Sequence, residues 1–212
     1  MTVQFLEISN LESRTSGLKD AGFREIQTKS EKYPHDDRVA VLKFIADYLI
    51  NSSDKIIKTQ ETIGYGSWVL KLKDSKEGNL EIWELNQNGE DYDLGADFSI
   101  GLLSKQRRIC KENEQECLLP SADRMIVLSP DVLSSNDIEG VRYKAPKHMS
   151  GWWLYTETYD GDIEKMKPHH IVHLIGKRPD IAQYLGLPPG HRFELKTGAV
   201  WFDENVKNQE NQ

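Results

Sequence analysis

Residues Lys147–Glu194 of this chain read KHMSGWWLYTETYDGDIEKMKPHHIVHLIGKRPDIAQYLGLPPGHRFE. They contain two of the five tryptophans, five of the six histidines and four of the eight prolines. Gly151–Thr156 is rich in aromatic and β-favouring residues, which predicts a strand. Successive side chains of a strand point to opposite faces. We therefore expect one of Trp152 and Trp153 to enter a core, and the other to meet a second layer, a partner or water.

A turn and a short helical segment are predicted after this strand. Tyr159–Asp162 is a turn sequence whose central glycine can take a positive φ. Asp162 can cap a short helical turn that stops before Pro168. Residues 169–175 alternate poorly between polar and apolar types, so helix and strand both remain open there.

The end of the stretch predicts a helix and a hairpin. Pro179–Leu185 has a proline at the first helical position and an apolar face, and a glycine and two prolines follow it. Arg192–Lys196 alternates as a strand. Thr197-Gly198 can close a hairpin onto Val200–Phe202.

The order of these motifs resembles that of a bacterial family called immunity protein thirty-three. The resemblance lies in the C-terminal half, where the motifs are structural and not catalytic. Two features depart from the family pattern, a shorter acidic segment after the tryptophan strand and a long added N-terminal half. The residues that carry the resemblance are Ser150-Gly151-Trp152, Arg178-Pro179-Asp180-Ile181 with Tyr184-Leu185, and Leu187-Pro188-Pro189-Gly190 with Phe193-Glu194.

The resemblance implies a non-enzymatic immunity protein that binds and neutralises a polymorphic toxin delivered by neighbouring bacteria. The implied mechanism is occlusion of the toxin's active site by a preformed surface, with charge speeding the encounter. We expect the contact residues to combine an outward tryptophan with the acidic turn that adjoins it in sequence. These candidates are Trp152, Trp153, Tyr159, Asp160 and Asp162.

Composition and charge limit the classes of partner. The net charge of −7 argues against nucleic acid and anionic membranes as partners, and fits a basic protein better. No apolar run approaches the roughly twenty residues of a membrane helix. The N-terminus has no basic region followed by a long apolar core, so we expect a cytoplasmic chain without a signal peptide. The sequence gives no indication of oligomeric state.

The N-terminal half contains one strong helix signal and several strand signals. Asp36–Asn51 has apolar residues at helical spacing after a start signal. Strands are predicted at 55–63, 67–73 and 80–85, and an edge strand within Thr2–Ser9. Residues 94–105 are ambiguous, and 107–116 suit a surface helix or a loop. Lys71 and Lys73 are expected to face Glu81 and Glu84 in cross-strand ion pairs.

The overall prediction is an α+β fold with mostly antiparallel sheets and a few short helices, in two small subdomains. The charged run before Pro120 resembles a linker, which places the subdomains at 1–118 and 119–205. Further strands are expected at Met125–Leu128 and Val141–Lys144. The polar tail after Phe202 is expected to be disordered, and 206–212 are assigned to no domain. A single α+β domain is the competing interpretation.

Two alternatives to an immunity protein come from other classes. One is a metal-dependent hydrolase that uses His169, His170 and His173. The His-Glu-x-x-His order of zinc hydrolases is missing, however, and Pro168 favours an extended form that would splay the histidines. The other alternative is a general protein-interaction module. We expect no bound metal or cofactor and no catalytic residues.

The two cysteines, Cys110 and Cys117, have no second pair that would complete a structural zinc site. Reduced thiols are expected for them in a cytoplasmic chain.

Overall fold

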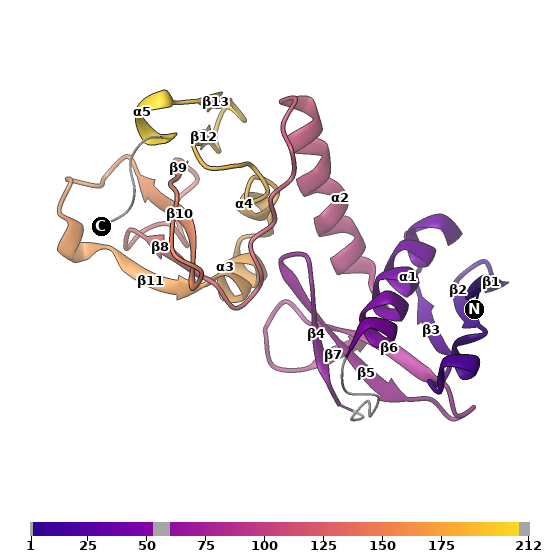
Figure 1. The fold of residues 1–212 in the computed structure, drawn as a ribbon. Coiled ribbons are helices and arrows are strands. Elements are labelled where there is room, and N and C mark those ends of the chain that lie inside the picture. Colours follow the sequence, from indigo (N-terminus) through magenta and orange to yellow (C-terminus); the bar gives the residue numbers. More distant parts are fainter. Residues whose placement is uncertain (1, 53–59, 208–212) are drawn as a thin grey trace. The chain divides into compact units, whose positions relative to one another are not determined.

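The computed structural model describes residues 2–52 and 60–207, and their fold is drawn in Figure 1. The chain divides into an N-terminal and a C-terminal compact unit, each with its own sheet and helices, so the predicted α+β class is confirmed. The C-terminal unit includes residues 102–118, which the sequence analysis placed in the first subdomain. The subdomain boundary between residues 118 and 119 remains a prediction. The N-terminal unit comprises Met1–Tyr65, Val69–Asn86 and Glu90–Gly101, and the C-terminal unit comprises Gly66–Trp68, Gln87–Gly89 and Leu102–Gln212.

The N-terminal unit is built on one sheet. Its strands within the described ranges run in the spatial order β1-β2-β3-β6-β5-β4, and β7 also pairs with β6. The β5–β6 pair is antiparallel, as the alternation predicted, and β1 lies at the sheet edge. The predicted strand at 55–63 lies largely outside the described residues. The strands are β1 (Gln4–Ser9), β2 (Glu12–Ser16), β3 (Ile26–Lys29), β4 (Thr62–Tyr65), β5 (Trp68–Asp74), β6 (Leu80–Leu85) and β7 (Tyr92–Leu94).

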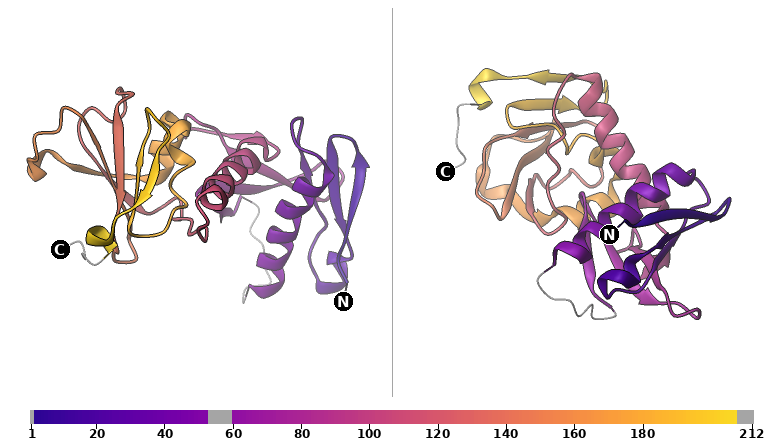
Figure 2. Two further views of the ribbon diagram at one scale, coloured as in Figure 1. Left: turned by 90° about the horizontal axis from the view of Figure 1, so that it is seen from above. Right: turned by 45° about the vertical axis from the view of Figure 1, so that its right-hand side comes forward.

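The helix α1 (His35–Asn51) packs against β1, β2 and β3, and Figure 2 shows it across one face of the sheet. This confirms the predicted helix. Between β2 and β3 the chain forms a short 3-10 turn, η1 (Leu18–Ala21). Sequence analysis assigned no elements to residues 11–27, because the side chains that β2 buries are Ser13 and Thr15 and give no apolar signal.

The predicted placement of Glu84 was wrong. In the part of the chain that the structure describes, neither lysine of β5 forms an ion pair with Glu81 or Glu84. The Lys73 Nζ instead lies 3.8 Å from the centroid of the Trp83 ring. Strand β6 buries every second side chain, so Glu84 points inward with Leu80 and Ile82.

Glu84 caps the N-terminus of the helix α2 (Asp97–Glu112). Its carboxylate accepts hydrogen bonds from the backbone N–H of Phe98 at 2.9 Å, the backbone N–H of Ser99 at 2.7 Å and the Ser99 hydroxyl at 2.8 Å. A carboxylate suits this position because the first N–H groups of a helix lack partners within the helix.

Replacing Glu84 with glutamine is expected to flatten the pH dependence of stability. Burial raises the pKa of Glu84, against the lowering effect of its three hydrogen bonds. The folded protein then binds a proton more tightly than the unfolded chain, so the free energy of unfolding falls as pH rises from about 4.5 through the folded-state pKa. Denaturant titrations across that range compare wild type with Glu84→Gln. Glu81→Gln, on the other face of β6, is the matched control. An equal fall in Glu84→Gln and wild type would contradict the prediction.

The C-terminal unit is built on a second sheet. Among the described residues its strands run in the order β11-β8-β10-β9-β12-β13. Strand β10 lies inside this sheet (Figure 1), parallel to β8 and antiparallel to β9. The strands predicted at Met125–Leu128, Val141–Lys144 and Gly151–Thr156 are confirmed within a few residues, as is the closing hairpin. The strands are β8 (Met125–Leu128), β9 (Ile138–Arg142), β10 (Met149–Thr156), β11 (Lys167–His170), β12 (His191–Glu194) and β13 (Val200–Phe202).

Short helical segments connect these strands. They are η2 (Ile163–Lys165), α3 (Ile171–Lys177), α4 (Pro179–Ala182) and α5 (Glu204–Lys207). As predicted, Asp162 caps η2, where its carboxylate accepts from the Glu164 N–H at 3.1 Å. Residues 169–175, for which the sequence allowed either helix or strand, contain both. Strand β11 ends at His170, and α3 begins at the next residue.

The start of the C-terminal tail is ordered, which corrects the expectation of disorder after Phe202. Asp203 accepts from the Arg192 Nε at 3.0 Å, and α5 buries Val206. Residues 208–212 lie outside the described residues.

The core of the C-terminal unit lies on the sheet face that Trp152 enters. Trp152 is fully buried, and its Nε1 donates to the Leu185 carbonyl at 3.0 Å. Its ring centroid lies 5.5 Å from that of Phe193, on which Tyr184 stacks at 4.4 Å. Gly140 leaves room for this cluster, because a Cβ there would lie 2.1 Å from the Phe193 ring. The stretch that predicts the fold therefore supplies both the central strand and the aromatic core.

Candidate functional site

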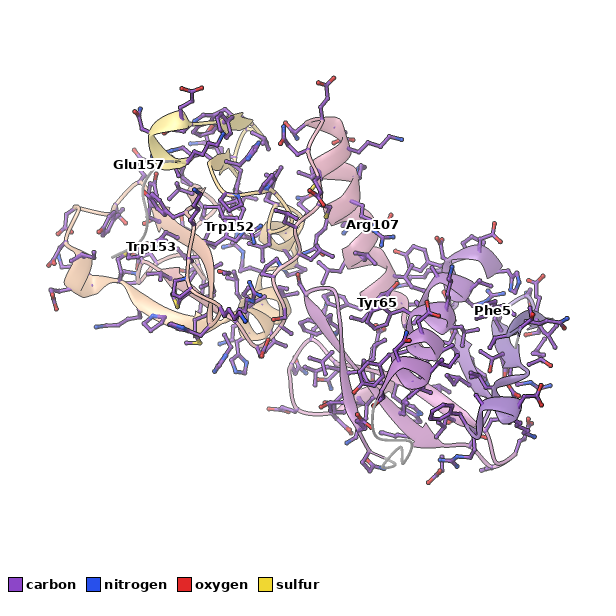
Figure 3. The ribbon with its side chains drawn as sticks, in the orientation of Figure 1. Phe5, Tyr65, Arg107, Trp152, Trp153 and Glu157 are labelled. Carbon is purple, nitrogen blue, oxygen red and sulfur yellow. The ribbon has the colours of Figure 1, made fainter. Side chains whose placement is uncertain are left out.

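The other face of this sheet carries partly exposed aromatic side chains. Trp153 lies opposite Val127 on one neighbouring strand and Val141 on the other, and residues paired in this way share a face. Both valines are buried, whereas Trp153 and Tyr155 are each partly exposed. The Trp153 indole N–H is buried without a hydrogen-bond partner in the described residues. Figure 3 labels Trp152 and Trp153 with their side chains.

A hydrogen-bonded cluster fixes the polar end of this face. The Tyr155 hydroxyl donates to the Glu139 carboxylate at 2.5 Å, and the Arg192 guanidinium donates to the same carboxylate at 2.5 Å and to the Tyr155 oxygen at 3.0 Å. Burial raises the pKa of Tyr155, and the hydrogen bond to Glu139 raises it further. The phenol therefore stays protonated, and the cluster holds the ring in place.

A pocket of about 380 Å³ opens beside the cluster. Its lining contains four carboxylates and one ammonium group, and the Lys196 Nζ lies 2.7 Å from an Asp137 oxygen. The surplus of negative charge next to an aromatic ring suits a positively charged side chain. The lining residues are Asp137, Glu139, Tyr155, Thr156, Glu157, Glu194 and Lys196, of which Figure 3 labels Glu157.

The structure separates the two predicted tryptophans. Trp152 is buried in the core, which leaves Trp153 as the member of the pair that reaches the surface. Tyr159 lies beside the pocket wall, because its ring centroid is 6.0 Å from that of Tyr155.

The predicted acidic turn is partly neutralised. Lys165 forms an ion pair with Asp160, and its Nζ lies 3.8 Å from an Asp162 oxygen. The hydrogen bond from Lys165 lowers the pKa of the exposed Asp160. The turn therefore carries less negative charge than its two aspartates alone would give.

Sequence reasoning missed the pocket. Its residues come from β9 and β10, from the positions next to the ends of these strands, and from the β12–β13 hairpin, which only the folded sheet brings together. The alternation of β10 could have found part of it, because it places Tyr155 on the same face as Trp153.

The histidines do not form a metal centre in the described ranges. His169 and His170 are neighbours on β11 and point to opposite faces. The His170 and His173 ring centroids are 6.0 Å apart, and the His170 Nδ1 donates to the Asp123 carbonyl. Within residues 2–52 and 60–207, no group of three or more histidine, cysteine, aspartate or glutamate side chains is arranged to hold a metal ion. The metal-dependent hydrolase was expected to use these three histidines, and no metal site is seen at them among the described residues.

None of the helices that the structure describes has the length and apolar character to span a bilayer.

Comparison with protein families identifies the C-terminal half. Residues 105–203 match the Imm33-like domain, which confirms the family indicated by the sequence motifs. The matched range contains β8 to β13, and with them the partly exposed aromatic face and the pocket. Comparison with curated proteins and with solved structures gave no match.

Proposed function

We propose that this protein is a non-enzymatic immunity protein that binds a protein toxin and neutralises it. The match of residues 105–203 to the Imm33-like domain carries the proposal, because a protein of an immunity family implies a toxin as its partner. The net charge of −7 supports a basic partner surface, toward which an acidic protein is steered.

The proposed contact surface joins the partly exposed aromatic side chains to the acidic pocket, and we call it the tryptophan face. It consists of Trp153, Tyr155 and Tyr159 together with Glu157 and Glu194. Tryptophan and tyrosine dominate the energetics of protein interfaces, and a neighbouring acidic pocket can receive a lysine or arginine of the toxin.

The proposed mechanism is occlusion of the toxin's active site by a preformed surface. Trp153 and Tyr155 lie on a strand that is hydrogen-bonded on both sides, and the Tyr155–Glu139–Arg192 cluster restrains the pocket wall. A surface that is ordered before binding loses little conformational entropy in the complex. We place Asp160 and Asp162 at the rim, where charge mainly affects the association rate.

Co-expression with the toxin encoded in the neighbouring gene is expected to restore growth, and the purified proteins are expected to bind tightly. Trp153→Ala should weaken binding by about 2 kcal/mol, about thirtyfold in dissociation constant. Reversing the charges of Glu157 and Glu194 should also weaken binding, and the affinity of this variant should depend less on salt concentration than that of the wild type. Reversing Asp160 and Asp162 should mainly slow association. Growth assays and binding kinetics at two salt concentrations measure these effects.

Glu90→Lys, in the N-terminal unit, is the control for a change in net charge alone. If wild type neither restores growth nor binds the toxin, the proposed function is wrong. If it does both while Trp153→Ala and the pocket variants bind unchanged, the function stands and the tryptophan face is the wrong surface.

A further inference from the structure

Cys110 and Cys117 form a pair of adjacent thiols in the C-terminal unit. Cys110 is buried in the last turns of α2, and Cys117 is partly exposed in the segment that follows. Both sulfurs lie against Gly186, because a Cβ on this glycine would be 2.8 Å from the Cys117 Sγ and 3.2 Å from the Cys110 Sγ. The Cys110 thiol donates a hydrogen bond to the Cys117 sulfur.

Backbone hydrogen bonds hold the two cysteines in place. The Gln115 N–H donates to the Cys110 carbonyl at 2.8 Å, and the Leu118 N–H donates to the Gly186 carbonyl at 2.8 Å. The chain around the two cysteines is thus restrained, and it holds both sulfurs beside Gly186.

A buried cation without a carboxylate partner lies near the pair. The Arg142 guanidinium donates to the backbone carbonyls of Leu118, Ser150, Leu185 and Leu187. Within the described part of the chain, no aspartate or glutamate forms an ion pair with it. Burial lowers the pKa of Arg142 to about 10, while the nearby cysteines act in the opposite direction. A thiolate would supply the anion that this cation lacks.

The two thiols have different acidities. The pKa of Cys117 is lowered to about 7, chiefly by the hydrogen bond from Cys110. Burial raises this pKa, whereas the charges of Arg107 and Arg142 lower it. The same hydrogen bond raises the pKa of Cys110, as burial also does. Near neutral pH a thiolate therefore forms at the more exposed sulfur, and the buried sulfur keeps its proton.

We propose that Cys117 and Cys110 are a redox-active pair that reacts with hydroperoxides, with Cys117 as the attacking thiolate and Cys110 as the resolving thiol. The Cys117 sulfur attacks one peroxide oxygen, the O–O bond breaks, and the leaving oxygen takes up a proton to give water or an alcohol. The Cys110 sulfur then attacks the sulfenic acid. The hydroxyl leaves with the Cys110 proton as water, and the S–S bond forms. The peroxide gains two electrons, and the two thiols lose them.

Oxidation changes the environment of the buried cation. The disulfide would remove the thiolate near Arg142, whose guanidinium holds the carbonyls of Leu118, Leu185 and Leu187. The same bond would tie the end of α2 to the segment beside Gly186. The inference does not depend on toxin binding, since none of these residues belongs to the tryptophan face.

Hydrogen peroxide added to the reduced full-length protein is expected to produce one intramolecular disulfide, seen by intact mass as the loss of two hydrogens. Cys110→Ser should stop at a sulfenic acid on Cys117 that dimedone traps. Cys117→Ser should consume peroxide about tenfold more slowly, because a thiol that keeps its proton is a poor nucleophile. Circular dichroism checks that both variants are folded.

The pH dependence of iodoacetamide alkylation tests the same pair in the wild-type chain. The rate at Cys117 should reach half its maximum near pH 7, the value to which its pKa is lowered. Arg107→Gln should move this midpoint upward. Arg108→Gln is the matched control, since this neighbouring arginine instead faces Glu112 at 3.9 Å. If wild type forms no disulfide, or if Cys117→Ser reacts as fast as wild type, the proposal is overturned.

Discussion

Replacing Trp152 with alanine is expected to lower the free energy of unfolding of the C-terminal unit by about 4 kcal/mol. The ring is fully buried between Phe193, at a centroid distance of 5.5 Å, and the Arg142 guanidinium, at 5.8 Å from its centroid. Its loss leaves a large cavity in the middle of the sheet face and removes the donor to the Leu185 carbonyl. Because domains retain only about 5–15 kcal/mol of net stability, this change is a large share of the total.

The neighbouring tryptophan provides the matched control for this prediction. Trp153→Ala removes the same side chain from the next position of β10, but the ring is partly exposed. We expect it to cost less than half as much stability and to affect toxin binding instead. Denaturant titrations followed by near-ultraviolet circular dichroism compare the two variants. Equal destabilisation by both would contradict the assignment of Trp152 to the core.

The two tryptophans also show how far the sequence predicts the site. Alternation along Gly151–Thr156 established that the rings point apart, but both are apolar, so the pattern could not say which one is buried. Which tryptophan is buried depends on how the strands pair. Strand β9 places Gly140 opposite Leu154, and the space that this glycine leaves beside Trp152 is filled by the Phe193 ring. This arrangement joins segments that are distant in sequence.

The missed elements of the fold have a similar physical cause. Residues 94–105 were ambiguous although they contain the first turns of α2. The buried side chains of this helix lie at helical spacing, but they include Ser99 and Gln106, which carry no apolar signal. Glu84 was misplaced because its charge suggested solvent exposure, whereas the start of α2 supplies three hydrogen-bond donors to it. A polar residue that is buried with its partners carries no hydrophobic signal.

Replacing Arg142 with methionine is expected to destabilise the C-terminal unit by about 4 kcal/mol, because several buried carbonyls would lose their donor at once. The guanidinium donates to Leu118 at 2.8 Å, Ser150 at 3.1 Å, Leu185 at 3.2 Å and Leu187 at 2.5 Å. These carbonyls belong to separate segments, so a single side chain ties β9 to the chain on both sides of the aromatic core. Methionine preserves much of the volume but donates no hydrogen bond.

Arg192→Met is the matched control, since Arg192 lies on the neighbouring strand β12 and forms its ion pairs with Glu139 and Asp203 while partly exposed. Its replacement should cost about 1 kcal/mol, because partly solvated ion pairs contribute little to stability. The loss of stability in Arg142→Lys should lie between those of the two methionine variants. Lysine keeps the positive charge, but its ammonium group lacks the planar guanidinium that reaches several carbonyls at once. Chemical denaturation of the three variants measures the order. If Arg142→Met and Arg192→Met lose the same stability, the buried carbonyls must find other donors, and Arg142 does not hold these segments together.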